Sequence, residues 1–131
     1  MADAMIRDVE DTMIIHPYSV PEEVQPGRSL ILKRVIRAED HGPNLSVTWV
    51  RISGHHERVV NDRCDRVYYI IEGSGRFQVG DGAPVETVSA GGFVYIAHGT
   101  PYEFSGEMTY LVSNGPAFTQ GSDRVLTSIL S

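Results

Sequence analysis

The feature that most constrains the fold is a series of short runs rich in β-branched and aromatic residues, separated by glycine-containing sequences. We expect strands at 29–36, 45–52, 67–71, 77–80, 85–88, 93–96, 102–105 and 108–113. Between them, Gly73-Ser74-Gly75 and Ser105-Gly106 among others are predicted to form hairpin turns, because glycine readily adopts a positive φ. No sustained helical period interrupts this series. The sequence therefore predicts an all-β, antiparallel sandwich or barrel.

The chain of 131 residues is long enough for one domain with a sizeable core, which we assign to residues 1–131. Residues 1–28 contain three prolines and are predicted to form an extended arm, with one strand near 13–16. Residues 115–131 are a tail, in which 124–130 are expected to form either a short helix or an edge strand.

Composition excludes several classes of partner. The net charge is -6 and no basic run offers a stripe for phosphates, so we expect no nucleic-acid partner. The apolar runs are too short to span a membrane, and the first ten residues do not resemble a signal peptide. The single Cys64 cannot form an internal disulfide and is expected to be an inert thiol. We therefore expect a cytoplasmic protein.

Two glycine-framed segments give a more specific indication, because their spacing resembles the two motifs of the cupin family. In the first, Gly54 is followed after five residues by Val60-Asn61-Asp62, after three more by Arg66, and after six more by Gly73. In the second, Gly91 is followed after five residues by Ala97-His98-Gly99, after two more by Tyr102, and after three more by Gly106. The resemblance covers residues 45–114 and implies a double-stranded β-helix, the cupin jelly-roll barrel.

The resemblance also implies a metal held by three histidines and a carboxylate, and here this chain departs from the family. Val60 offers no donor atom, Arg66 carries a fixed positive charge, and the phenol of Tyr102 is a poor ligand. Only Asp62 is a plausible ligand, so we expect no metal at the usual position and no other cofactor.

The histidines leave an alternative open. His55, His56 and His98 could approach one another near the barrel mouth and, with Asp62 or Asp65, form a displaced site for a divalent transition metal. Otherwise His55 and His56 are a solvated pair and His98 is a turn residue.

The residues at the vacated ligand positions are themselves candidates for a binding site. We expect Asp62, Arg66 and Tyr102 to project into one cavity, with Arg66 able to bind a carboxylate or phosphate through two hydrogen bonds. The candidate ligand contacts are Asp62, Arg66, Tyr68, Tyr102 and His98. The strand alternation that turns Arg66 inward also turns Tyr68 inward, whereas a slip of one residue would reverse both. The alternative is that the Asp–Arg pair and the tyrosine merely fill the space.

Three functions fit these residues. The first is binding of a small anionic or sugar-like molecule in the barrel. The second is a metal-independent isomerase, epimerase, cyclase or lyase, with Tyr102 and Asp62 as its catalytic acid and base. The third is a dioxygenase-like enzyme that uses the displaced His55, His56 and His98 site. The fold accommodates all three.

A homodimer is also expected. An open antiparallel barrel leaves sheet edges and one apolar strand face that need cover, and the run at 13–15 is too short to fold alone. We expect the N-terminal arm to take part in the contact. Trp49 could line the cavity, although a core or interface position is the more usual one for a tryptophan.

Overall fold

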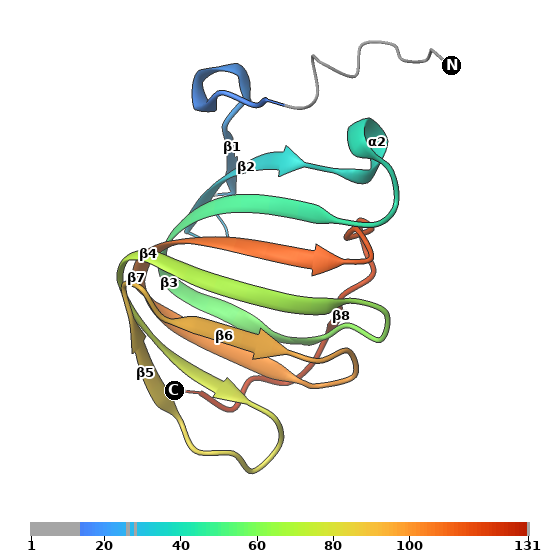
Figure 1. Cartoon of the computed structure of the whole chain (residues 1–131). Coiled ribbons are helices and arrows are strands. Elements are labelled where there is room, and N and C mark those ends of the chain that lie inside the picture. Colours follow the sequence, from blue (N-terminus) through green and yellow to red (C-terminus); the bar gives the residue numbers. More distant parts are fainter. Residues whose placement is uncertain (1–13, 26, 28, 131) are drawn as a thin grey trace.

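The computed structural model describes residues 14–25, 27 and 29–130 and is built almost entirely of antiparallel β-strands (Figure 1). The elements are a 3-10 helix at Pro17–Ser19, β1 (Glu23–Gln25), β2 (Leu30–Ile36), α2 (Ala38–His41), β3 (Ser46–Val60), β4 (Asp65–Val79), β5 (Glu86–Ser89), β6 (Phe93–Ile96), β7 (Tyr102–Gly115) and β8 (Arg124–Val125). The all-β prediction is confirmed.

The strands are ordered β1-β2-β3-β7-β4-β5, with β6 also paired to β4 and β8 also paired to β3. The three central strands, β3, β7 and β4, are 14 or 15 residues long, and each contributes to both halves of the barrel. Figure 1 shows them turning together at one side of the molecule. This is the double-stranded β-helix that the motif spacing implied.

A row of glycines lies where these three strands turn. Gly106 of β7 is opposite Gly54 of β3 on one side and Gly75 of β4 on the other. A Cβ atom on Gly106 would lie 2.4 Å from the backbone oxygen of Ser74 and 2.7 Å from the Cα of Gly75. At Gly106 only glycine allows β7 and β4 to approach this closely, so this residue fixes the position of the turn.

The prediction of hairpin turns at Gly73-Ser74-Gly75 and Ser105-Gly106 is wrong. Both sequences lie inside long strands, β4 and β7, and their ladder with each other continues through the bend. The glycines do supply unusual backbone, with φ of 80° at Gly73 and 159° at Gly106, but they bend the strand rather than reverse it.

The inner face of β4 follows the alternation that the sequence predicts. Arg66, Tyr68 and Ile70 are buried, whereas Val67 and Tyr69 are only partly buried. Tyr68 packs edge-on against the rings of Phe77, Phe104 and Tyr110, with centroid distances of 5.1 to 5.9 Å. The register that places Arg66 inside the barrel is therefore confirmed.

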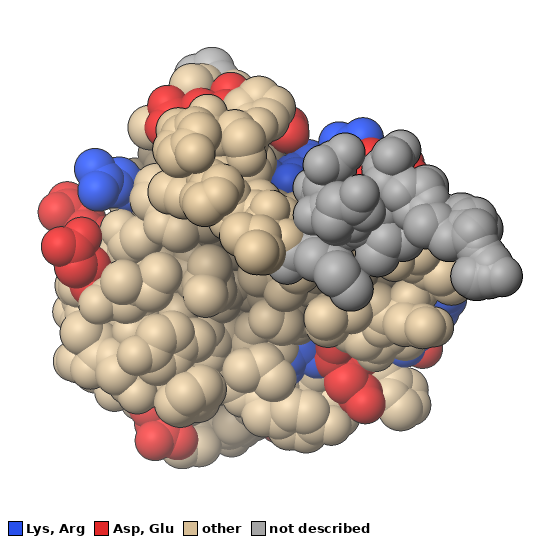
Figure 2. Space-filling view, turned by 45° about the horizontal axis from the view of Figure 1, so that its top comes forward, with Lys and Arg blue, Asp and Glu red and all other residues tan. Residues whose placement is uncertain are grey.

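The ends of the chain differ in part from expectation. Of the strand expected at 13–16, Met13 lies outside the described residues, and 14–16 form no strand. In the arm, β1 pairs with β2. In the tail, β8 pairs with the end of β3, which confirms the edge-strand alternative for its first residues. No described helix is long and apolar enough to cross a membrane. On the face seen in Figure 2, Lys and Arg occur only in separate small groups.

We predict that Gly73→Ala lowers the free energy of unfolding by about 3 kcal/mol or more, because the new Cβ would lie 2.1 Å from the backbone oxygen of Glu107. Gly82→Ala is the matched control, since Gly82 has a similar φ of 76° but open space around it. That change should cost only about 1–2 kcal/mol. Equal losses in urea denaturation would show that φ, and not the close approach of the strands, is what demands glycine.

Candidate functional site

A cavity of about 150 Å³ lies inside the barrel. One part of its wall is apolar and includes Leu32, Val50 and Val112. The other part is polar and includes Arg66 and Tyr68 of β4, Asn114 of β7, His56 of β3, Asp123 of the C-terminal tail, and Arg34 of β2, which is itself paired with Glu23. An apolar wall with a few convergent polar groups is the usual lining of a ligand site, although this cavity is smaller than the usual range of about 300–1,000 Å³.

Arg66 is the centre of the polar wall. It is only 4% exposed, and its guanidinium donates hydrogen bonds to Asn114 Oδ1, to Tyr102 Oη at 2.7 Å and to Asp123 Oδ1 at 3.0 Å. A second hydrogen bond to Asp123 Oδ2 is 3.3 Å long. The positive charge of Arg66 is therefore compensated inside the protein, by the carboxylate of Asp123.

Two buried phenols extend this network. The hydroxyls of Tyr68 and Tyr102 lie 2.6 Å apart, and Tyr102 also accepts the hydrogen bond from Arg66. Burial raises the pKa of both tyrosines, although the charge of Arg66 partly offsets this effect. Burial alone would lower the pKa of Arg66, but Tyr102, Tyr68 and Asp123 raise it. At neutral pH the cluster therefore contains two neutral phenols and a charged guanidinium.

The expectation that Asp62 projects into the cavity is wrong. Asp62 lies in the turn between β3 and β4, where Asn61 Oδ1 accepts hydrogen bonds from the amides of Arg63 and Cys64. This turn directs Asp62 to the surface, where its carboxylate pairs with Arg124 at 3.0 Å. Asp123 occupies the role beside Arg66 that the sequence analysis gave to Asp62.

The expectation that His98 contributes to the cavity is also wrong. His98 is exposed in the loop before β7, and its amide and its Nδ1 both contact Asp65 Oδ1, at 3.0 and 2.8 Å. Hydrogen bonds from His98 lower the pKa of the Asp65 carboxyl. This pair belongs to the surface.

The three histidines of the displaced metal site do not converge. His55 contacts Glu103, His56 lines the cavity, and His98 pairs with Asp65. Within the described part of the chain, no group of three or more His, Cys, Asp or Glu residues is arranged to hold a metal ion.

Asn114 and Asp123 are the two partners of Arg66 that sequence reasoning missed. Asn114 lies opposite Arg66 in the β4–β7 ladder, and this pairing cannot be known before the register of two distant strands is known. Asp123 comes from a tail with no motif. It is held in place by Asn61, which donates a hydrogen bond of 2.8 Å to its Oδ1.

A second polar cluster lies on the other face of β7, around Glu103. This carboxylate is 0% exposed and accepts hydrogen bonds from His55 Nε2 at 2.6 Å, Ser128 Oγ at 2.5 Å, and the amides of Ile129 and Leu130 at 2.7 and 3.0 Å. Arg58 Nη1 is 3.6 Å from the same carboxylate. Burial alone would raise the pKa of Glu103, but these donors lower it to about 2.

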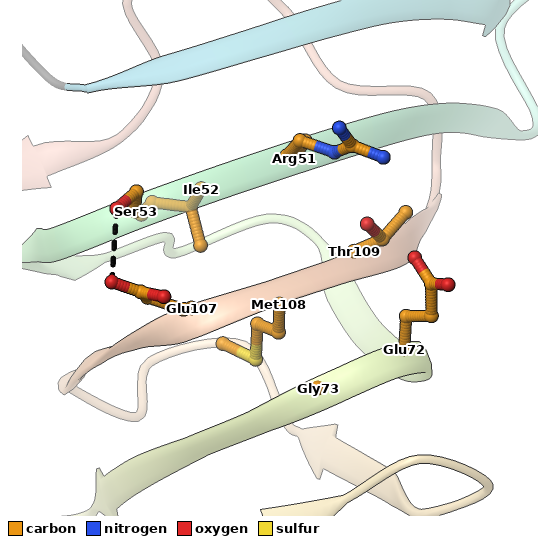
Figure 3. A pocket seen from close by; sticks show the side chains of 8 residues that line it. All are labelled: Arg51, Ile52, Ser53, Glu72, Gly73, Glu107, Met108 and Thr109. Atoms are coloured by element: carbon orange, nitrogen blue, oxygen red, sulfur yellow. Dashed lines mark hydrogen bonds between the residues drawn. The ribbon is translucent and has the colours of Figure 1, made fainter.

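A wider hollow of about 430 Å³ lies on the outer face of the sheet, across β3, β7 and β4. Figure 3 shows Arg51, Thr109 and Glu72 side by side there, and the hydrogen bond of 3.4 Å from Ser53 to Glu107. These are mostly exposed side chains, and they are not joined to the buried network. We therefore place the functional site in the barrel.

Comparison with known proteins supports the fold. No protein-family model matches the sequence, and no curated protein matches it. Pac13 from Streptomyces, described as a nucleoside dehydratase, superposes with a TM-score of 0.75 at 17% identity, over 90% of this chain and 93% of Pac13. The polyketide cyclase RemF from Streptomyces resistomycificus gives 0.72 at 20% identity, over 88% of this chain and 86% of RemF. The protein has the cupin fold.

Cupin-fold neighbours differ in the reactions for which they are named. Oxalate decarboxylase from Bacillus subtilis also matches, with a TM-score of 0.70 at 16% identity, over 83% of this chain but 30% of that enzyme. A dehydratase, a cyclase and a decarboxylase thus share one architecture. The cupin fold alone does not select a reaction, which has to be argued from the residues in the cavity.

Because the pKa of Glu103 is lowered to about 2, its ionisation stabilises the fold above the ordinary glutamate pKa, and this stabilisation is lost as the pH falls towards 2. We predict that the wild type loses about 3 kcal/mol more stability between pH 5 and pH 2 than Glu103→Gln does. Glu107→Gln, an exposed neighbour on β7, should follow the wild type. Parallel pH curves for Glu103→Gln and the wild type in urea denaturation would contradict this account.

Proposed function

We propose that the barrel cavity binds a small neutral, polyhydroxylated molecule, a sugar or a nucleoside, without a resident metal or other cofactor. The observation that carries the proposal is the pairing of Arg66 with Asp123 in a buried network. We also propose a cytoplasmic location, which the single buried Cys64 thiol fits.

The pairing favours a neutral ligand over an anion. An anion would have to compete with Asp123 for Arg66, whose Nε and Nη1 also donate to Asn114 and Tyr102. A neutral hydroxyl can instead share the polar atoms of the network without disturbing its charge balance. Of the two ligand classes that the sequence left open, anionic and sugar-like, we therefore propose the second.

The lining of the cavity suits such a ligand. Hydroxyl groups can bond to Tyr68, Asn114 and Asp123 on the polar side, while the carbon face of a ring packs on the apolar wall. The ring of His56, which stacks on Phe104 at a centroid distance of 4.6 Å, adds a flat surface. Structures of Pac13 contain uridine, a nucleoside, which supports the same class of ligand.

A second candidate function is metal-independent elimination of water from such a ligand. The uridine-containing Pac13 structures carry single replacements, of a histidine by glutamine or of a tyrosine by phenylalanine. This chain gathers the same residue types, with His56 and Tyr102 at a centroid distance of 6.2 Å and the two tyrosine hydroxyls hydrogen-bonded.

The roles of these residues in an elimination follow from their hydrogen bonds. His56 Nδ1 lies 2.8 Å from the carbonyl oxygen of Glu57 and donates to it, so in the neutral ring Nε2 is the basic nitrogen. His56 would take a proton from carbon, the electron pair left behind would form a C=C bond as the C–O bond on the neighbouring carbon breaks, and Tyr68 would protonate the departing hydroxyl, which leaves as water. Tyr102 and Arg66 would then stabilise the phenolate. Asp62, the base considered first, is too far out to serve.

We further propose a homodimer that uses the outer face of the sheet. Trp49, Leu111, Tyr69 and Phe93 form one row across β3, β7, β4 and β6. Phe93 is 70% exposed, and Trp49 is covered only in part, with Lys33 Nζ 5.5 Å from its ring centre. A second copy of the chain, with its N-terminal arm, would bury this row.

We predict that Asp123→Asn changes the selectivity of the cavity. Uridine and ribose should raise the melting temperature of the wild type, with or without a chelator, whereas pyruvate and phosphate should not. In Asp123→Asn the charge of Arg66 is uncompensated, so one of these anions should gain about ten- to a hundredfold in affinity by calorimetry. Asp62→Asn, which removes a surface carboxylate, is the matched control. Failure of every neutral ligand to bind the wild type would refute the proposed function.

We predict a solution mass of twice 14.5 kDa by light scattering. Phe93→Ser should shift the equilibrium towards monomer, because it removes an exposed aromatic side chain from the proposed contact. Val85→Ser, at an exposed apolar position outside the row, should leave the mass unchanged. Deletion of residues 1–16 should weaken the dimer as well. A monomer mass over a wide concentration range would contradict the proposal.

A further inference from the structure

The C-terminal segment at 118–130 connects the barrel cavity with the buried carboxylate of Glu103. At its start, Phe118, Gln120 and Asp123 form part of the cavity wall. At its end, Ser128, Ile129 and Leu130 donate hydrogen bonds to Glu103. The segment that forms one side of the cavity is thus also hydrogen-bonded, at its other end, to Glu103 on the opposite face of β7.

Glu103 points away from the cavity and towards the C-terminal segment. Its strand neighbours, Tyr102 and Phe104, point into the barrel, so Glu103 points outward. It is nevertheless 0% exposed, because the segment lies across it. Three of the donors to its carboxylate come from the segment, and the fourth is His55 of β3.

Elsewhere the segment is held mainly by polar contacts: Asp123 bonds to Asn61 and Arg66, and Arg124 bonds to Asp62 at the surface. Its regular structure is the two-residue strand β8, extended by a hydrogen bond from the amide of Leu126 to Arg58 O. Its apolar side chains are at most partly buried: Phe118, Leu126 and Leu130 are partly covered, and Val125 and Ile129 are 62% and 61% exposed. A segment that buries so little apolar surface opens at a lower free energy than the core does.

We propose that residues 118–130 form a strap that opens to give access to the barrel cavity, and that Glu103 is a positioning residue that holds the strap closed through Ser128 and the amides of Ile129 and Leu130. The identity of the admitted molecule, a sugar or a nucleoside, rests on the proposed function. The existence of the strap does not depend on that function. Opening moves Asp123 away from Arg66 and exposes the polar wall.

Hydrogen exchange on the full chain tests whether the strap opens by itself. The amides of Leu126, Ile129 and Leu130 should exchange faster than those of core strands β3 and β7. In Glu103→Gln they should exchange about ten- to a hundredfold faster than in the wild type, with core amides unchanged. Glu107→Gln is the matched control. Ser128→Ala, which removes one donor and leaves the core intact, should give the same effect at a smaller size. Strap amides that exchange only as slowly as the core would overturn the proposal.

Access to the cavity is measured independently of any ligand. Val112 lines the cavity, so Val112→Cys places a thiol inside it, and peptide mass spectrometry separates its alkylation by iodoacetamide from that of Cys64. Alkylation of this thiol should be at least about tenfold faster when combined with Glu103→Gln than with Glu107→Gln. Equal rates, with strap amides that do exchange faster, would show that the strap is mobile but is not the access route, and would overturn the proposal.

Uridine separates the strap from the proposed function. Bound uridine should slow both the alkylation of Val112→Cys and the exchange of the strap amides. If uridine and ribose have no effect while Glu103→Gln accelerates both, the strap stands and the ligand class is wrong.

Discussion

The close approach of β3, β7 and β4 at the glycine row is the constraint on which the rest of the structure depends. Gly106 stands opposite both Gly54 and Gly75, and a side chain at Gly106 would collide with the backbone of β4. Because the strands bend there instead of ending, one strand can contribute to both halves of the barrel. The inward residues of β4 and β7, Arg66 and Tyr102 among them, are thereby brought to face the interior of one barrel.

Burial of Arg66 carries a desolvation cost, which its hydrogen-bond partners and the carboxylate of Asp123 offset. A buried guanidinium is strongly unfavourable unless it is paired and fully hydrogen-bonded. The barrel strands supply two neutral partners, Asn114 and Tyr102, but the compensating charge comes from Asp123, outside the barrel strands. The buried pair need not stabilise the fold more than apolar residues would. It does leave the cavity polar and close to neutral, and this is why we assign it a neutral, hydroxyl-rich ligand.

What could be predicted from the sequence follows from local chemistry. Alternation along β4 placed Arg66 and Tyr68 inside, because burial of one strand face fixes the register. The glycines of β4 and β7 did not reveal where the chain reverses, because a positive φ is equally compatible with a tight turn and with a bend inside a strand. The positions of Asp62 and Asp123 could not be predicted from local chemistry. The turn held by Asn61 directs Asp62 outward, and only the return of the tail across the barrel brings Asp123 to Arg66.

Asp123, which compensates the charge of Arg66, links the ligand selectivity of the cavity to the access of ligands to it. Asp123 belongs to the strap, so any opening that exposes the cavity also separates the carboxylate from Arg66. Leaving a buried guanidinium unpaired costs several kcal/mol of free energy. Water that enters the cavity solvates the guanidinium and reduces this cost. The open state is therefore expected to be short-lived, and a neutral molecule that has entered is enclosed when Asp123 returns. An anion bound to Arg66 would instead occupy the place of Asp123 and hold the strap away from the barrel. Neutral ligands and a closed strap thus favour each other, through the same ion pair.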